Sequence, residues 1–298
     1  MVNNAVDNSK SSEAKLIKEK IAVVTGTSSG FGLLITLSLA QAGYRVIATM
    51  RDLSKQTKLL ALTEEAGVSE LIECMQLDVT KPSEIEQVTT TILHTWGHID
   101  VLINNAGFAV GGYTEDVPMT EWYRQMDTNF FGVVAITKAI LPTMRKQKAG
   151  MIINMSSVSG KIGFPGYAPY AASKFAVEGF SEALRLEMVP FGVKVVLVEP
   201  GSYKTDIWQK GFDQMCSPVD SPYRSNLETV LRYSRHSAHT APDPQQVADI
   251  IVKIVQSKNP KLRYLVGKGS SALMLGKALL PWKSLERVLH RLLNKYRV

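Results

Sequence analysis

The sequence predicts an α/β protein with a single doubly wound parallel sheet and helices on both faces. Short apolar runs alternate with longer segments of helical periodicity from residue 20 onward, and this alternation implies parallel pairing of the strands. The predicted strands are apolar throughout, as expected when helices cover both faces of a sheet. The first strand also passes directly into a glycine-rich turn, "TGTSSGFG" at residues 25–32.

The predicted elements follow one another in a regular order. "KIAVVTG" is rich in β-branched residues and ends in glycine, which is typical of a buried strand. A helix runs from Phe31 to Ala42 and ends at Gly43, and "YRVIATM" is the second strand. The remaining elements are a helix over 53–66, a strand over 71–77, a helix over 81–96, a strand over 99–103, a helix over 119–147, a strand over 150–155, a helix over 168–190 and a strand over 193–198.

We divide the chain into a polar tail (1–19), one dinucleotide-binding catalytic domain (20–266) and a basic C-terminal extension (267–298). Within the domain, residues 202–243 contain proline, serine and scattered aromatic residues, and we expect a long loop that closes over substrate. Ile207, Trp208 and Phe212 would then form an apolar pocket wall, or would anchor the loop to the core.

Composition and charge exclude several classes of protein. The net charge of +7 comes from basic residues that are scattered, except near the C-terminus, and no nucleic-acid motif occurs, so we expect no nucleic-acid partner. The five histidines and the two cysteines (Cys74 and Cys216) lack the spacing of a metal site. Because two isolated cysteines form no disulfide framework, we expect a reducing, cytoplasmic location. The first twenty residues carry no apolar signal region, and no apolar run reaches the roughly 18 residues that span a bilayer.

The glycine-rich turn suits a phosphate group. Gly26, Gly30 and Gly32 permit a tight turn and let the backbone approach a pyrophosphate closely. The helix that follows presents its N-terminal N–H groups and its dipole to that anion. Because the turn follows a strand and opens a helix, we favour dinucleotide binding over a purely structural glycine turn.

Residues at the end of the second strand favour NADP(H). A carboxylate there would hold the ribose 2′-hydroxyl of NAD, but the strand ends at Thr49-Met50, before Asp52. Arg51 follows at once, and a guanidinium suits a 2′-phosphate in bidentate geometry. The alternative is that Arg51 is a solvated surface side chain.

"GYAPYAASKF" at 166–175 contains two tyrosines and one lysine. Lys174 lies four residues after Tyr170, so these two side chains share one face of a predicted helix, whereas Tyr167 has no such partner. At about 4 Å and an effective dielectric constant near 20, an ammonium stabilises a phenolate by roughly 4 kcal/mol, or about three pKa units. We therefore expect Lys174 to bring the pKa of Tyr170 toward 7, as suits an acid–base catalyst. The strand "MIINMSS" ends in Ser156-Ser157, and a hydroxyl there would align the reacting oxygen.

Together these motifs resemble the short-chain dehydrogenase/reductase family over about residues 20–205. "TGTSSGFG" resembles its cofactor loop, with Phe31 where isoleucine is more common. "LDVT", "NNAG" and "TNFFG" resemble further family motifs, and "PGSYKT" matches its Pro-Gly-x-x-x-Thr. The family places its catalytic serine 13 residues before the tyrosine, which selects Ser157 over Ser156. The resemblance implies a Rossmann-like fold.

The resemblance also implies roles for particular residues. Asn129 would hold a water in a proton relay with Lys174, unless it only bends a helix or is a buried polar residue. Lys174 would also bind the nicotinamide ribose. The expected catalytic residues are Asn129, Ser157, Tyr170 and Lys174. The expected cofactor-binding residues are Gly26, Thr27, Ser28, Ser29, Gly30, Phe31, Gly32, Arg51, Asp78, Val79, Asn105, Ala106, Gly107, Tyr170, Lys174, Pro200, Gly201 and Thr205.

"YRVIATMRDLSK" is similar to the corresponding region of NADP-preferring steroid and retinol dehydrogenases. NAD-preferring members have an aspartate 18 residues after the last loop glycine, and here Met50 occupies that slot. This similarity implies an apolar alcohol or carbonyl substrate. The resemblance also implies a homo-oligomer.

The C-terminal extension contains a predicted basic amphipathic helix. Its apolar residues (Leu285, Val288, Leu289, Leu292 and Tyr296) fall on one face, and Pro281 separates it from a shorter helix. We favour docking of this helix on its own domain or on a second subunit. The alternative is contact with a membrane surface.

The sequence thus predicts an NADP(H)-dependent oxidoreductase that interconverts an alcohol and a ketone or aldehyde. The competing hypothesis is a catalytically idle NADP-binding regulator on the same fold. Because a sensor needs no proton relay, the complete set of Asn129, Ser157, Tyr170 and Lys174 favours the enzyme.

Overall fold

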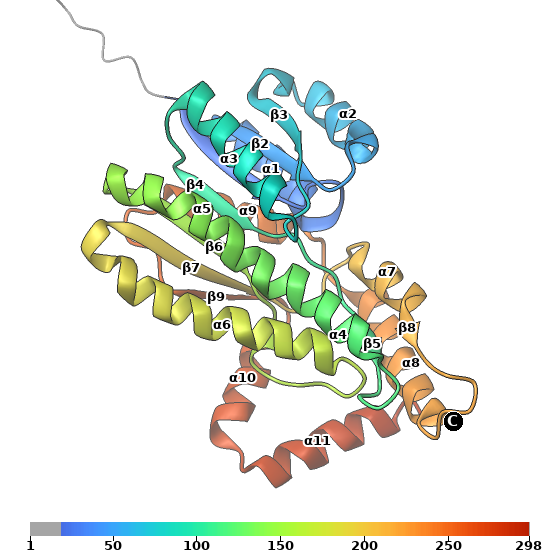
Figure 1. The fold of residues 1–298 in the computed structure, drawn as a ribbon. Coiled ribbons are helices and arrows are strands. Elements are labelled where there is room, and N and C mark those ends of the chain that lie inside the picture. Colours follow the sequence, from blue (N-terminus) through green and yellow to red (C-terminus); the bar gives the residue numbers. More distant parts are fainter. Residues whose placement is uncertain (1–18, 298) are drawn as a thin grey trace, which may run out of the picture.

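A seven-stranded parallel sheet forms the centre of the computed structural model, which describes residues 19–297 (Figure 1). Its strand order is β3-β2-β1-β4-β6-β7-β9. The strands are β1 (Lys20–Thr25), β2 (Tyr44–Met50), β3 (Ile72–Gln76), β4 (Val101–Asn104), β6 (Gly150–Met155), β7 (Val193–Pro200) and β9 (Arg263–Val266). The chain turns from one half of the sheet to the other between β1 and β4, and open sheets of this kind bind ligands at that point. Residues 1–18, which make up most of the predicted polar tail, lie outside the described residues.

Helices cover both faces of the sheet, which confirms the predicted fold class. The helices are α1 (Gly30–Gln41), α2 (Thr57–Glu65), α3 (Pro82–Trp96), α4 (Met119–Met126), α5 (Gly132–Gln147), α6 (Ala168–Met188), α7 (Ile207–Asp213), α8 (Arg224–Thr240), α9 (Gln245–Gln256), α10 (Ser270–Leu279) and α11 (Trp282–Asn294).

The pleat of the strands explains the two-sided core. In β1, Ala22 and Val24 belong to the buried cluster that includes α1 and α9, whereas Ile21 and Val23 belong to the cluster that includes α3, α5 and α6. Successive side chains of a strand point to opposite faces, so a strand covered on both sides has to be apolar at every position. Residues 21–24 are accordingly inaccessible to solvent.

The segment 202–243 is not the long loop that the sequence predicted. It forms α7, the short strand β8 (Met215–Cys216) and the long helix α8, and β8 pairs with β5 (Gly111–Gly112). Leu227 and Val230 are three residues apart, and α8 buries both on one face. The prolines and serines that suggested a loop occur mostly before α8, where they end β8 and introduce the helix.

Two further elements differ from the prediction. The helix expected over 119–147 is α4 and α5 joined by a π-helical turn, Asp127–Phe131. The structure also contains α9 and β9, which lie beyond the last strand that the sequence predicted. As predicted, Pro281 separates two helices at the C-terminus, α10 and α11. Among residues 19–297, no helix is long and apolar enough to cross a membrane, and no group of His, Cys, Asp and Glu side chains could hold a metal ion.

Candidate active site

The glycine turn between β1 and α1 is held in one shape by its neighbours. Gly26 has a φ of +71°, a backbone conformation that favours glycine. A β-carbon on Gly32 would overlap the carbonyl oxygen of Gly26 and lie 2.5 Å from Nδ2 of Asn105. That Nδ2 donates to the carbonyl oxygens of Thr25 (2.8 Å) and Gly26 (3.0 Å). The turn therefore leaves the N-terminus of α1 open at the end of the sheet.

A cleft of about 460 Å³ runs from this turn along the carboxyl ends of the strands. It brings together most of the predicted cofactor-binding residues, namely Gly26, Ser28, Ser29, Gly30, Phe31, Arg51, Asp78, Val79, Asn105, Ala106, Gly107, Tyr170, Lys174 and Thr205. The cleft lining does not include Thr27, Gly32, Pro200 or Gly201. Thr27 is buried and donates Oγ1 to the carbonyl oxygen of Thr49 (3.2 Å), so it holds the turn in place.

The end of β2 offers positive charge to the cleft. Arg51 is exposed there, and Lys55 also lines the cleft. Asp52 accepts hydrogen bonds from Oγ (2.7 Å) and the backbone N–H (3.0 Å) of Ser54. These hydrogen bonds lower the pKa of the Asp52 carboxyl. Asp52 thus caps its own 3₁₀ turn, although it also lines the cleft, and its rejection as a ribose ligand stays a prediction.

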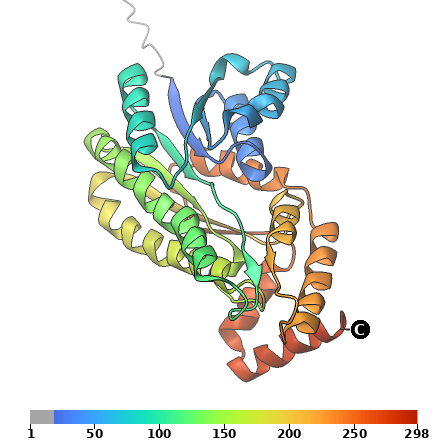
Figure 2. The ribbon, with the colours of Figure 1, turned by 45° about the vertical axis from the view of Figure 1, so that its right-hand side comes forward.

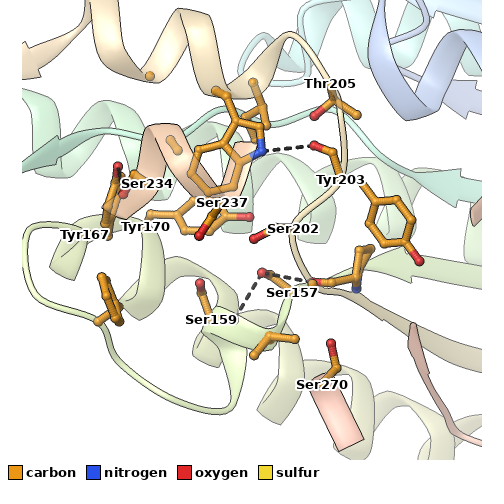
Figure 3. Close-up of a pocket in the computed structure, with 18 of the residues that line it drawn as sticks. Ser157, Ser159, Tyr167, Tyr170, Ser202, Tyr203, Thr205, Ser234, Ser237 and Ser270 are labelled. Atoms are coloured by element: carbon orange, nitrogen blue, oxygen red, sulfur yellow. Dashed lines mark hydrogen bonds between the residues drawn. The ribbon is translucent and has the colours of Figure 1, made fainter. Parts of the chain in front are cut away.

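A second cavity of about 430 Å³ meets the cleft at Tyr170, which lines both (Figure 3). Its wall combines apolar side chains with hydroxyl groups, and of the described residues that line it, Lys268 alone carries a charge. The predicted Ser157 lines this cavity and donates Oγ to the carbonyl oxygen of Pro200 (3.4 Å). Pro200 and Gly201 belong to this cavity as well.

The aromatic residues after Pro-Gly have two different roles. Ile207 and Trp208 line the second cavity, as one of the two interpretations predicted. Trp208 also donates its Nε1 proton to the carbonyl oxygen of Tyr203 (3.0 Å). Phe212 lies outside the lining, and its ring lies 5.7 Å from the guanidinium carbon of Arg235 on α8, so it connects α7 to α8.

Tyr170 and Lys174 lie one turn apart on α6. Lys174 Nζ is 5.7 Å from the centre of the Tyr170 ring and donates to the carbonyl oxygen of Met155 (2.8 Å), at the end of β6. Ser156, next to Met155, lines both the cleft and the second cavity. The end of β6 and the first turns of α6 therefore converge where the two spaces meet.

The family model described as short chain dehydrogenase matches residues 20–215. This chain belongs to the short-chain dehydrogenase family. It is 44% identical to an uncharacterised oxidoreductase, YusZ, of Bacillus subtilis, over 92% of this chain and 99% of that one. It is 38% identical to a 3-ketodihydrosphingosine reductase of Bacteroides thetaiotaomicron (84% and 89% covered) and 36% identical to bovine retinol dehydrogenase 8 (93% and 91% covered).

Solved structures of short-chain dehydrogenases have the same fold. One from Streptomyces avermitilis has a TM-score of 0.77 at 31% identity, covering 92% of this chain and 95% of that one. A metagenomic short-chain oxidoreductase in complex with NADP has a TM-score of 0.66 at 28% identity, covering 83% and 96%. The chain is thus an oxidoreductase of this family with retinol-dehydrogenase-like relatives, as the sequence predicted.

In this short-chain dehydrogenase the protein's own groups keep Tyr170 protonated. Burial raises the pKa of the Tyr170 phenol, and the Ser157 hydroxyl only partly opposes this. Burial lowers the pKa of Lys174 to about 8, against the charge of Glu178, which raises it. The prediction that Lys174 brings the pKa of Tyr170 toward 7 is therefore wrong for the protein alone, because loss of hydration dominates for both groups.

Asn129 lies in the π-helical turn between α4 and α5 and is buried. Its side chain accepts from the N–H of Phe108 (3.1 Å) and donates to the carbonyl oxygen of Phe108 (2.9 Å) and to Oγ of Ser173 (3.2 Å). Ser173 in turn donates to the carbonyl oxygen of Tyr170 (2.7 Å). Asn129 thus connects the loop after β4 to the turn of α6 that carries Tyr170, and its part in a proton relay stays a prediction. π-Helical turns occur frequently at functional sites.

Sequence reasoning missed one contact at the glycine turn. Lys210 on α7 donates Nζ to Oγ of Ser29 (3.0 Å) and lines the cleft. No local motif marks Lys210, because its proximity to Ser29 depends on how α7 folds back over residues far away in the sequence.

Proposed function

We propose that this short-chain dehydrogenase interconverts an alcohol and a ketone or aldehyde with NADP(H). The observation that carries the proposal is that Tyr170 lines both the cleft and the second cavity, with Lys174 beside it. A phenol at this junction can exchange a proton with a substrate oxygen in the second cavity while it faces a dinucleotide in the cleft. The nicotinamide supplies or accepts the hydride when the dinucleotide is bound.

The residues of the cleft fit a dinucleotide. The glycine turn leaves no room for a β-carbon at Gly32, and it presents the N-terminus of α1 to a pyrophosphate. Asp78 and Val79 line the part of the cleft where adenine is expected, and Arg51 and Lys55 supply charge for a 2′-phosphate. The NADP bound by the metagenomic relative supports the choice of NADP over NAD.

The protein's own groups then divide the proton chemistry. In reduction, Tyr170 donates its proton to the carbonyl oxygen as the carbonyl carbon accepts the hydride. Burial raises the pKa of the phenol and so keeps it protonated before the reaction. Ser157, on the cavity wall, hydrogen-bonds the same oxygen and holds it in line. Lys174 stabilises the phenolate that remains after the proton transfer. Asn129, through Ser173, holds the helical turn that carries Tyr170 in position.

The second cavity favours an uncharged and largely apolar substrate. Aromatic and aliphatic side chains from several segments line it, including Ile162, Phe164, Trp208 and Leu273. A volume of about 430 Å³ suits a ligand of drug size. Relatives named for retinol and for 3-ketodihydrosphingosine support a lipid-like substrate.

Turnover tests the proposal directly. We expect the protein to oxidise NADPH in the presence of at least one apolar ketone or aldehyde from a panel of steroids, retinoids and long-chain carbonyls. Tight NADPH binding without turnover on any of them, in either direction, would favour the idle regulator instead.

Arg51→Ala is expected to raise the Kd for NADPH by about 10- to 100-fold, because one charge-assisted contact to the 2′-phosphate contributes about 1.5–3 kcal/mol. The Kd for NADH should change by less than about twofold, since NADH lacks that phosphate. Fluorescence titration with both cofactors measures this. Lys58→Ala is the matched control, because Lys58 is exposed on α2 outside the cleft. Equal losses for both cofactors would remove the assignment of Arg51.

The kcat/KM for carbonyl reduction should decrease at alkaline pH. Lys174, with a pKa of about 8, is an ammonium below that pH and loses its charge above it, so kcat/KM should decline as pH rises through about 8. Glu178 raises the pKa of Lys174, and Glu178→Gln should therefore move the decline to lower pH. Glu182→Gln is the control, since Glu182 also pairs with Arg263 but does not affect Lys174. An unshifted profile for Glu178→Gln would contradict this electrostatic account.

A further inference from the structure

The positive charge of this protein is concentrated at one end of the chain. Residues 267–298 contain seven of the 34 lysines and arginines but only one of the 27 acidic residues, Glu286, which gives this segment +6 of the net +7. A strongly uneven charge distribution of this kind acts on charged partners at the surface.

The same segment exposes a set of large apolar side chains. Leu275 (61% exposed) and Leu279 (72%) are four residues apart and share one face of α10. Leu280 (43%) and Trp282 (58%) are exposed on either side of Pro281, at the start of α11. We call Leu275, Leu279, Leu280 and Trp282 the elbow patch. All four are large apolar side chains within eight residues of one another in the sequence.

The basic side chains next to the patch face solvent. Lys283 and Arg287 are exposed on α11, and the Arg287 guanidinium donates Nε to the carbonyl oxygen of Lys283 (3.2 Å). Lys277 is different, because it donates to the carbonyl oxygen of Lys161 and also lies over the Phe175 ring. From Gly267 to Leu285 the sequence contains no acidic residue. The elbow patch therefore has a basic border.

The rest of α11 packs on its own domain, as the sequence analysis favoured. Leu285 is buried, and the Tyr296 ring lies 5.4 Å from that of Tyr233 on α8. In Figure 2 the C-terminal helices, in red, lie at the lower end of the molecule beside α8, in orange. Internal docking thus uses Leu285 and Tyr296 and leaves the elbow patch outside.

The elbow patch begins on a helix that also borders the second cavity. Lys268, Gly269, Ser270 and Leu273, at the start of α10, line that cavity. Tyr233, whose ring packs against that of Tyr296 just after α11, lines it too. The helix α10 therefore carries both residues that line the second cavity and two exposed leucines of the elbow patch.

We propose that the elbow patch docks on the surface of an anionic lipid membrane. The apolar side chains enter the boundary between headgroups and acyl chains, Trp282 lies at headgroup depth, and Lys283 and Arg287 meet the lipid phosphates. Charge complementarity favours an anionic membrane as the partner of this surface. A second copy of the chain is disfavoured, because it would bring an equally basic segment against the basic border. This inference rests on the proposed function. If the substrate is lipid-like, docking brings the second cavity close to the membrane in which that substrate is dissolved.

Vesicle co-sedimentation of the full chain, without cofactor or substrate, tests the docking. We expect the protein to sediment with vesicles of phosphatidylcholine mixed with phosphatidylglycerol, far less with phosphatidylcholine alone, and less at high salt because screening weakens the contact. Leu275→Ser with Leu279→Ser should reduce binding at least about tenfold, as expected when two leucines no longer enter the lipid. Leu186→Ser is the control, because Leu186 is 76% exposed on α6.

A second pair of variants tests the charges. Lys283→Glu with Arg287→Glu should reduce binding to the anionic vesicles at least about 30-fold, since each basic residue near such a surface contributes about 1 kcal/mol and the new carboxylates are repelled. Lys258→Glu, on an exposed site outside the extension, should bind as the wild type does. Thermal unfolding of every variant excludes misfolding as the cause.

Three results would overturn the proposal. These are wild-type protein that stays in the supernatant with anionic vesicles, leucine variants that sediment as well as wild type, or leucine variants whose main change is a smaller assembly in lipid-free ultracentrifugation. The last result would mean that a second copy of the chain covers the patch. Since the assay needs no turnover, its failure is distinguishable from a failure of the proposed enzyme activity.

Discussion

Replacing Tyr170 by phenylalanine is expected to lower kcat for carbonyl reduction by about 10³-fold or more, as for the loss of a general acid. The ring would keep its place where the cleft and the cavity meet, while the proton that Tyr170 donates would be gone. The Kd for NADPH should change by less than about threefold, because the glycine turn and Arg51 are untouched. Steady-state kinetics and fluorescence titration measure the two quantities separately.

Tyr167→Phe is the matched control for this experiment. Tyr167 lines the same cavity and is three residues away, but its hydroxyl donates to Oγ of Ser234 (3.1 Å) on α8. Its loss should affect KM more than kcat. If Tyr170→Phe kept near-normal turnover, or if both variants lost turnover equally, the role given to Tyr170 would be wrong.

Gly32→Ala is expected to have the second largest effect, on both stability and cofactor binding. The new methyl group would overlap the carbonyl oxygen of Gly26 and lie 2.5 Å from Asn105 Nδ2, which itself holds two backbone carbonyls. Backbone atoms cannot move aside cheaply, so the variant should lose about 1–3 kcal/mol of unfolding free energy, as overpacked sites do. Calorimetry and NADPH titration should show a lower Tm and weak binding.

Gly163 and Gly179 provide the controls for this variant. A β-carbon on either residue would meet no atom within 4 Å. Gly179 lies inside α6, where alanine is the better helix former, so Gly179→Ala should stabilise the protein by up to about 1 kcal/mol. A Gly32→Ala protein with wild-type Tm and NADPH affinity would show that the turn has more room than the structure indicates.

The parts of the site that the sequence predicted are those whose geometry is local. Tyr170 and Lys174 are one helical turn apart wherever the helix lies, and the glycine turn has its shape because β1 leads directly into α1. The end of β2 is local in the same sense, because the strand ends at Met50 as the sequence indicated. The choice of Arg51 over Asp52 as the ribose contact stays a prediction. Parallel pairing then brings these strand ends to one edge of the sheet.

The parts that could not be predicted depend on contacts between distant segments. The helix α8 is ordered by packing such as the stacking of Tyr233 on Phe164, whose ring centres lie 5.1 Å apart, and composition alone suggested a loop. The pKa of Tyr170 depends on how deeply other segments bury the phenol, and an argument from Lys174 alone gave the wrong direction. Pro200 and Gly201 were predicted at the cofactor, but the fold places them on the second cavity.

A crystal structure of the protein with NADP⁺ and an apolar secondary alcohol tests the central claim most directly. The account predicts that the alcohol oxygen lies within about 3 Å of both Tyr170 Oη and Ser157 Oγ, with the nicotinamide between the cleft and the second cavity. An alcohol whose oxygen is bound by other side chains, with Tyr170 Oη turned away from it, would contradict the account.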